Sequence, residues 1–188
     1  MELPWNDPRS NKFATTIGLI TSSGSSGPNI MACEWTHHLS YKPGLIAVSL
    51  GPTKSTAGNI SHNQEFGINI CALDQSILSS IAGGYSGNDY NKISALKELG
   101  FEFYNANHIK TLMVKGASLN VECNLYKEIT LGDHIMFIGE VIDATHNPKK
   151  QPLVYHDGKY WSLQALIKPD TDERKRVREV LEKYKKRK

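Results

Sequence analysis

Short runs of β-branched and other apolar residues, each closed by a turn signal, recur along most of this chain. Examples are FATTIGLIT at residues 13–21, LIAVSL at 45–50 and FGINICAL at 66–73. These runs have the length and composition of β-strands. No regular alternation of strand and helix links them, as a parallel sheet would require. The pattern therefore predicts a mainly β protein built on an antiparallel barrel.

The other expected elements follow from the same signals. Further strands are expected at 30–35, 112–115, 117–129, 134–145, 153–155 and 160–163, and helices at 53–63, 74–81, 92–99 and from 170 onward. The serine- and glycine-rich run 22–29 is expected to be a hairpin loop that gives no side chain to the core. A polar loop is expected around His37 and His38, and Asp74 is the expected N-cap of the second helix.

The length of 188 residues is typical of one domain that buries a sizeable core. Neither an internal repeat nor a segment of linker composition divides it. We therefore expect a single domain over residues 1–188, with the barrel core at about 10–165 and a basic helical extension at 170–188.

Much of the formal net charge of +3 lies in the final segment, ERKRVREVLEKYKKRK, at 173–188. Apolar Val177, Val180 and Leu181 interrupt these charges at roughly helical spacing. This spacing favours a solvated amphipathic helix over a nucleic-acid-binding arm. Nucleic acid is therefore not an expected partner.

The three cysteines, Cys33, Cys71 and Cys123, are widely spaced and form no CxxC pair. Their placement in apolar runs predicts small buried side chains in a reducing compartment. The N-terminal segment MELPWNDPRSNK has no signal-peptide pattern, and no apolar run is long enough to cross a bilayer. A cytoplasmic protein without a membrane partner is the expectation.

A phosphate-binding segment is predicted at residues 52–56, Pro-Thr-Lys-Ser-Thr, where a helix is expected to begin. The first amides of a helix have no partner within it and carry a partial positive charge, which suits an anion. Three hydroxyls and one ammonium group lie within the same turn. Thr53 or Ser55 is the expected cap, and an ordinary helix cap beside a lysine would explain the same residues.

A second candidate segment is the strand Asn29–Trp35. Small Ala32 and Cys33 would let a planar ring approach the backbone closely, and the polar edge of that ring could pair with backbone amides and carbonyls. Glu34 and Trp35 would then lie beside the ring or at a subunit contact. A plain barrel strand with one apolar face is the alternative.

In their order and spacing, these segments resemble the FMN-binding split-barrel flavin reductases. The positions that match the family pattern are Asn29, Met31, Ala32, Trp35, Ser40, Pro43, Lys54, Thr56, Phe66 and Asn69. Residues 86–89, Ser-Gly-Asn-Asp, resemble the family's Ser-Gly-Arg-Asp loop, but Asn88 replaces the basic residue. Residues 132–134, Gly-Asp-His, resemble a late strand of the family. The likeness covers about residues 10–165.

This resemblance implies an antiparallel Greek-key split β-barrel with a few peripheral helices and a C-terminal helix. It implies FMN as cofactor, NAD(P)H as a transient co-substrate, and hydride transfer to the flavin in a flavin or ferric reductase. It also implies a homodimer with each flavin near the interface, and a small-molecule or protein electron acceptor.

The residues that the resemblance assigns fall into four groups. Ala32, Cys33, Glu34 and Trp35 would contact the isoalloxazine, and Ser49, Leu50 and Gly51 the ribityl chain and ring edge. Lys54, Ser55 and Thr56 would contact the phosphate, and Ser86 and Gly87 would be secondary flavin contacts. His134 is the catalytic candidate, at the mouth where a nicotinamide could dock. No metal site is expected, because His37 and His38 have no suitably spaced partners.

Two other functions fit the sequence. A flavoredoxin-like protein would keep FMN and exchange electrons with protein partners without its own NAD(P)H turnover. A non-enzymatic barrel module could instead bind RNA or protein through its basic tail. There is no GxGxxG motif after a strand, so NAD(P)H would have to bind transiently over the flavin.

Overall fold

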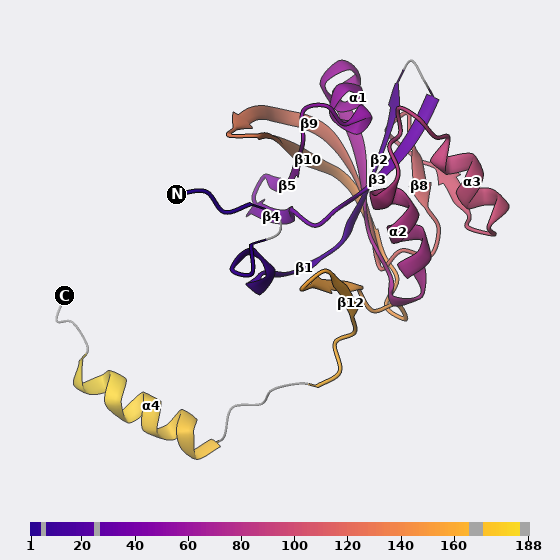
Figure 1. The fold of residues 1–188 in the computed structure, drawn as a ribbon. Helices are drawn as coiled ribbons and strands as arrows, with labels where there is room; N and C mark the ends of the chain where they lie inside the picture. The colour runs from indigo at the N-terminus through magenta and orange to yellow at the C-terminus, as the bar shows by residue number, and fades with distance from the viewer. Residues whose placement is uncertain (5–6, 25–26, 166–170, 185–188) are drawn as a thin grey trace.

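The computed structural model describes residues 1–4, 7–24, 27–165 and 171–184 (Figure 1). Its strands are β1 Ala14–Thr16, β2 Gly18–Gly24, β3 Gly27–Cys33, β4 Thr36–Tyr41, β5 Gly44–Leu50, β6 Glu65–Ile70, β7 Phe103–Asn105, β8 Leu112–Val114, β9 Leu119–Leu131, β10 His134–His146, β11 Val154–His156 and β12 Lys159–Trp161. Its α-helices are α1 Ser55–Asn63, α2 Ser76–Gly84, α3 Lys92–Glu98 and α4 Thr171–Lys183, and two short 3₁₀ turns lie at Ser10–Lys12 and Leu73–Gln75. The mainly β prediction is confirmed.

A seven-stranded antiparallel sheet with the order β3-β2-β6-β9-β10-β5-β4 forms the centre of the protein. Its two outermost strands, β3 and β4, are joined by only Glu34 and Trp35. Because so short a connection spans roughly 10 Å, the sheet must curl until its two edges nearly meet. The backbone N–H of Ser49 on β5 donates to the Trp35 carbonyl at 3.1 Å, which continues the β4–β5 pairing, and the Cys33 thiol on β3 reaches the Ser49 carbonyl at 3.4 Å from the other edge. The result is a barrel-like sheet that is split beside residues 34–35.

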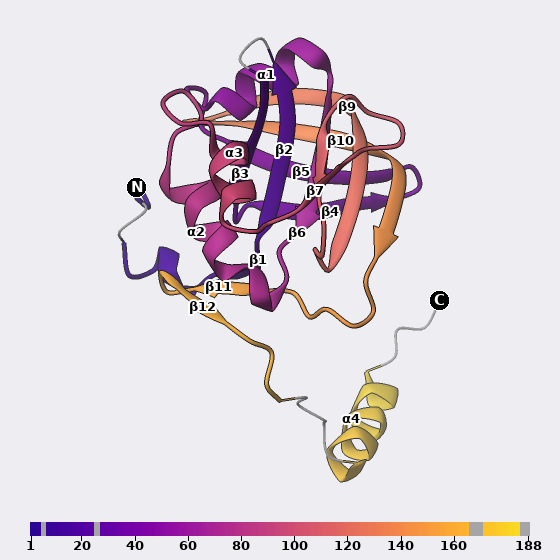
Figure 2. The same cartoon turned by 90° about the vertical axis from the view of Figure 1, so that its right-hand side faces the viewer.

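The sheet is buried on both faces where β2 crosses it. Leu19 and Ile20 point to opposite faces, and both are fully buried. Ile20 packs with Val48, Phe66 and Phe137 inside the curled sheet, whereas the Leu19 face is covered by α2 and α3 (Figure 2). Burial on both faces explains why the apolar residues Leu19 and Ile20 are adjacent in β2 and do not alternate with polar ones.

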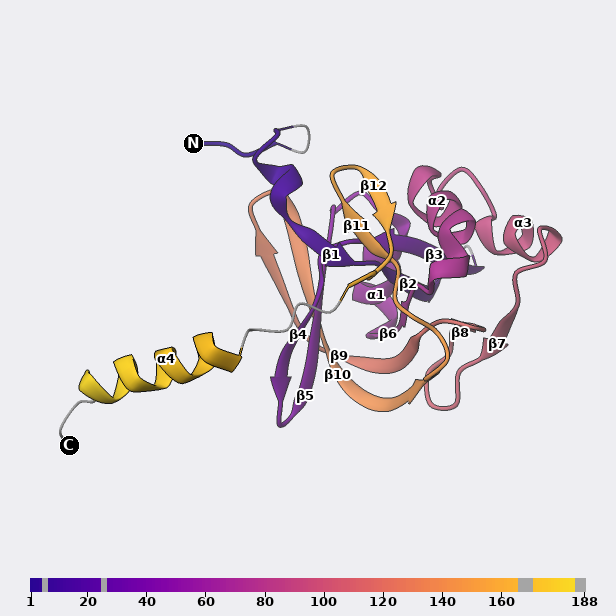
Figure 3. The ribbon, with the colours of Figure 1, turned by 90° about the horizontal axis from the view of Figure 1, so that it is seen from below.

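The tail forms the predicted amphipathic helix. Helix α4 lies apart from the barrel in two views (Figures 1 and 3), and Val177 and Leu181 on it are exposed. Among the described residues, no helix combines the length and apolarity that crossing a bilayer needs.

Two expected loops proved to be strands. The hairpin around 22–29 exists, but β2 runs to Gly24 and β3 begins at Gly27, so only residues 25–26, outside the described residues, join them. Ser22 and Asn29 are buried, which corrects the expectation that this run gives nothing to the interior. The stretch with His37 and His38 is the edge strand β4, whose backbone pairs with β5 while its polar side chains face outward.

Helix starts also differ from the sequence prediction. Lys54 is the N-cap of α1, in place of Thr53 or Ser55, and Gln75 precedes α2, in place of Asp74. Within the part of the chain that the structure describes, no side chain accepts a hydrogen bond from the first turn of α1. This open helix start matters for the site described next.

Candidate functional site

The N-terminus of α1 is an uncapped helix end beside the sheet. Lys54 is extended and exposed, Ser55 is half-buried and Thr56 is buried. Gly51, just after β5, accepts a hydrogen bond from the Lys54 amide at 3.1 Å. The amides that follow carry the partial positive charge of the helix end. The predicted phosphate residues therefore do lie together at a helix start.

Asn29 on β3 braces this helix end. Its side-chain amide donates to Ser55 Oγ at 3.0 Å and to Thr56 Oγ1 at 2.8 Å. Each hydroxyl has one proton to donate as well as lone pairs that accept. Since the two oxygens already accept from Asn29, both protons are left to donate to an acceptor beyond the helix end. Asn29 belongs to the family pattern, but no local sequence pattern predicts this bracing contact.

The loop of residues 86–88 closes over the same helix end. An added Cβ on Gly87 would lie 2.4 Å from both Asn29 Oδ1 and Ser55 Oγ, so the loop approaches as closely as glycine allows. Asn88 donates from its backbone to Ser86 Oγ at 3.1 Å and from its side chain to the Thr53 carbonyl at 3.4 Å. Asn88 thus ties the loop to the helix start instead of supplying the family's charge there.

Lys92 is a buried cation that sequence reasoning did not single out as a site residue. Its ammonium donates to the Ala82 and Tyr85 carbonyls at 2.9 and 3.0 Å. Burial, and then repulsion from Lys54, lower the pKa of Lys92 to about 8. Two positive charges that repel each other near the helix end favour an anion between them. In the sequence, only its position after the Ser-Gly-Asn-Asp loop indicates that Lys92 could belong to the site.

The predicted ring-contact residues lie where the sheet is split. Ala32 and Cys33 are at the end of the edge strand β3, and α2 covers Ala32. The Cys33 thiol donates to the Ser49 carbonyl at 3.4 Å, and burial raises its pKa to about 11. Cys33 is therefore a neutral, packed thiol. All three cysteines are free and buried, as predicted.

Trp35 and His134 form an aromatic pair at the same split. Their ring centroids are 4.5 Å apart, and Trp35 is 43% exposed. His134 Nδ1 lies 2.8 Å from an Asp133 carboxylate oxygen, and this hydrogen bond lowers the pKa of Asp133. Next to Trp35, Glu34 is half-buried, and burial raises the pKa of its carboxyl group. A broad indole face and a histidine with one nitrogen held are thus available to a planar ligand.

Leu50 is fully buried in the core, so only its backbone could reach a ligand. Ser49 is half-buried and faces the same side of the sheet as Met136, its neighbour on β10. The residues predicted to contact the ring, 32–35, and those predicted to contact the phosphate, 54–56, are connected through β5 and Gly51. This order of ring, ribityl and phosphate residues matches the order of the parts of a flavin mononucleotide.

The family of the chain follows from comparison of its whole sequence with known domains. The model for the "Flavin reductase like domain" matches residues 10–164. The chain belongs to this flavin reductase family. The predicted resemblance to this family over about residues 10–165 is therefore confirmed, and α4 lies outside the matched residues.

Relatives of this flavin reductase family member include the NADH-dependent FMN reductase AsuE2 of Streptomyces nodosus subsp. asukaensis. It is 30% identical over 152 residues, which is 80% of this chain and 79% of the relative. The solved flavoredoxin of Desulfovibrio vulgaris (Miyazaki F) has a TM-score of 0.76 at 23% identity, covering 91% of this chain and 98% of that one. The NADH:FAD oxidoreductase SgcE6 of Streptomyces globisporus C-1027 also has a TM-score of 0.76, at 19% identity, with 88% and 99% covered. The two structures share the fold.

Proposed function

We propose that this chain binds FMN and is an NAD(P)H-dependent flavin or ferric reductase. The observation that carries the proposal is the meeting of three distant segments, at Asn29, Lys54–Thr56 and Ser86–Asn88, around one uncapped helix start. Hydroxyl groups, helix amides and the Lys54 ammonium meet there, and the buried ammonium of Lys92 is near enough for Lys54 to lower its pKa. The 30% identical relative, an NADH-dependent FMN reductase, supports the same assignment.

FMN fits this corner better than FAD does. The terminal phosphate of FMN carries close to two negative charges at neutral pH. The corresponding phosphate of FAD is esterified to the ribityl chain and joined by an anhydride bond to the adenosine phosphate, so it carries one. A corner with Lys54, the nearby Lys92 and a helix start favours the larger charge. One structural neighbour is an NADH:FAD oxidoreductase, so FAD belongs in the test.

When bound, the flavin supplies the redox chemistry, accepting a hydride from NAD(P)H and passing electrons to an acceptor. The chain supplies position and charge. Lys54, Ser55 and Thr56 would hold the phosphate, with Ser86 and Gly87 closing over it. The backbone of residues 32–34 and 49–51 would line the ring and ribityl chain. Since Asp133 engages Nδ1 of His134, Nε2 is the nitrogen that would meet the nicotinamide.

Substituting Lys54 tests this assignment. We expect Lys54→Ala to weaken FMN about tenfold, because one exposed ammonium is worth on the order of 1 kcal/mol against a phosphate. Steady-state NADH oxidation should then need about tenfold more FMN while kcat stays unchanged. Lys97→Ala, which removes an equal charge from α3, is the control. Equal FMN requirements in both variants would contradict the phosphate assignment, and FAD titrations in parallel would show which flavin the corner prefers.

The same assay separates the second candidate function. The similarity to a flavoredoxin favours an FMN protein that exchanges electrons with other proteins. Such a protein would hold FMN yet oxidise NADH no faster than free flavin does. Steady turnover dependent on added FMN supports the reductase.

We also propose a homodimer with each flavin near the interface. Leu45, Met136, Ile138 and Ile129 share the outer face of the curled sheet, opposite the core residues, and each is only half-buried. His134, two residues before Met136, extends this apolar face to the predicted ring site. An apolar sheet face of this kind is typical of a subunit contact.

Light scattering tests the dimer. The wild-type chain should have twice the mass of 21.0 kDa, and Ile138→Glu should give a monomer that binds FMN more weakly, because a buried charge disrupts an apolar contact. A wild-type monomer that retains FMN would refute the dimer.

A further inference from the structure

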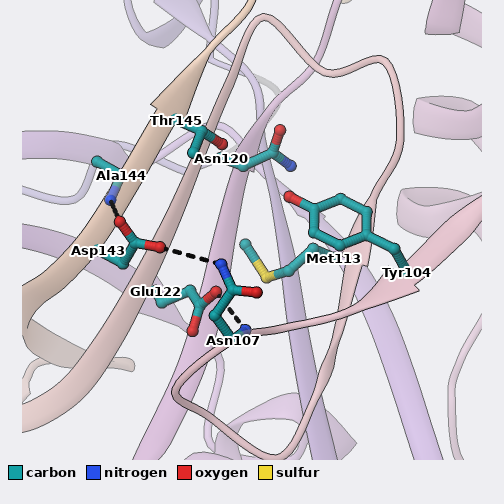
Figure 4. A pocket seen from close by; sticks show the side chains of 8 residues that line it. All are labelled: Tyr104, Asn107, Met113, Asn120, Glu122, Asp143, Ala144 and Thr145. Carbon is teal, nitrogen blue, oxygen red and sulfur yellow. Dashed lines mark hydrogen bonds between the residues drawn. The ribbon is translucent and has the colours of Figure 1, made fainter.

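A second hollow, remote from the flavin corner, lies between the β7–β8 hairpin and the far ends of β9 and β10 (Figure 4). Its volume is about 250 Å³. Asp143 in its wall stands nine residues after His134 on the same strand, about 30 Å along an extended chain. None of the residues predicted to hold flavin lines this hollow.

Two carboxylates face each other across the strands that form one wall. Asp143 on β10 pairs directly with Glu122 on β9, next to an irregularity in the register between Val141 and Asp143. Like charges directly opposite each other on neighbouring strands are destabilising, and such bulges redirect side chains near functional sites. No lysine or arginine is among the residues that line the hollow.

The two carboxylates differ in the hydrogen bonds that they already accept. Glu122, 4% exposed, accepts backbone hydrogen bonds from Asn107, His108 and Ile109 at 2.8, 2.7 and 3.2 Å. It anchors that loop. Asp143 accepts from the Ala144 amide at 2.8 Å and from the Asn107 side chain at 3.3 Å, and His108 Nε2 is 3.9 Å away. Asp143 therefore has capacity left for a further cationic donor.

An aromatic ring forms the opposite wall. Tyr104 lies across the hollow from Asp143, and Met113 lies between them (Figure 4). The Tyr104 hydroxyl is directed toward Asn120. Burial raises the pKa of Tyr104. The hydrogen bond with Thr145 lowers this pKa, whereas the negative charges of Glu122 and Asp143 raise it further. The field of both carboxylates thus extends across the hollow. A carboxylate and an aromatic side chain that line one hollow can hold the ammonium group and the carbon body of an organic cation.

We propose that this hollow binds a small organic cation, with its ammonium group on the Asp143 carboxylate and its carbon body against Met113 and Tyr104. Within the described ranges no cluster of three or more histidine, cysteine or acidic side chains could hold a metal ion. The Tyr104 ring and the Met113 thioether suit the carbon body of an amine. The site is independent of the flavin corner.

The test uses three probes with one ring and different charge: benzylammonium, benzyl alcohol and benzoate. Calorimetry with the full chain saturated with FMN should show benzylammonium binding at least about tenfold more tightly than the other two. In NMR spectra, the side-chain amides of Asn107 and Asn120 should shift on titration. Equal binding of the alcohol, or shifts confined to the flavin corner, would overturn the proposal.

Asp143→Asn keeps the shape of the side chain and its contact with Ala144, and should weaken benzylammonium binding about tenfold or more. Glu98→Gln, which removes an equal charge from α3, is the control and should bind as the wild type does. Tyr104→Leu removes the opposite wall, leaves both carboxylates in place and should cost about fivefold. Unchanged binding in both hollow variants, or an equal loss in the control, would overturn the proposal.

Discussion

Gly87→Ala should reduce FMN affinity about 100-fold while the protein without flavin stays folded. The added methyl group would lie 2.4 Å from Asn29 Oδ1 and Ser55 Oγ, far inside contact distance. Either the 86–88 loop or the Asn29 brace must move, and a displacement of about 1 Å in a binding constellation costs on the order of 100-fold. Gly87 is not among the glycines with positive φ, so the effect is steric and not one of backbone strain.

Gly84→Ala is the matched control. It lies three residues away, at the end of α2, and an added Cβ there meets nothing within 4 Å. FMN titration followed by flavin fluorescence should separate the two variants by about two orders of magnitude, with melting temperatures of the flavin-free proteins close to the wild type. Equal FMN affinities would mean that the 86–88 loop does not cover the flavin.

Asn29→Leu should have the second large effect, reducing FMN affinity by roughly 10–100-fold. The leucine matches asparagine in size but removes two hydrogen bonds at 3.0 and 2.8 Å. The Ser55 and Thr56 hydroxyls would then turn to other partners, so their protons would no longer point toward the phosphate. The free energy of unfolding should fall by about 1–3 kcal/mol, because Thr56 is buried.

Asn59→Leu separates the site from the fold. Asn59 is on α1, the helix that carries Ser55 and Thr56, and donates to Ser22 Oγ at 3.1 Å. Loss of this hydrogen bond should also destabilise the protein. The Asn59 side chain contacts Ser22 on β2, one turn beyond the helix start, so FMN affinity should stay unchanged. Denaturant unfolding and FMN titration of both variants check this, and a parallel loss of FMN affinity in Asn59→Leu would show that the effect of Asn29 is only structural.

The strand-rich fold and the helix start at residues 54–56 could be predicted because their signals are local. Runs such as 45–50 are apolar enough to be central strands, and the donors at 54–56 are consecutive in the sequence. The edge strand β4 was missed because its pairing with β5 uses the backbone, which polar side chains such as those of His37 and His38 do not reveal. The strand β7 has only three residues, too few for periodicity to register.

The contacts that complete the site could not be predicted because they join residues far apart in sequence. Asn29 reaches Ser55 across 26 residues, and Asn88 reaches Thr53 across 35. The buried state of Lys92 depends on carbonyls at the end of α2. The pairing of Asp143 with Glu122 depends on a register irregularity that no local pattern predicts.

We propose that the phosphate of FMN binds to the amides and hydroxyls that begin α1, with its ring at the split beside Trp35. A crystal structure of the FMN complex would test this placement. We expect phosphate oxygens within hydrogen-bond distance of Ser55 and Thr56, and the isoalloxazine against residues 32–35. FMN bound elsewhere, with those two hydroxyls turned away from it, would refute the proposal.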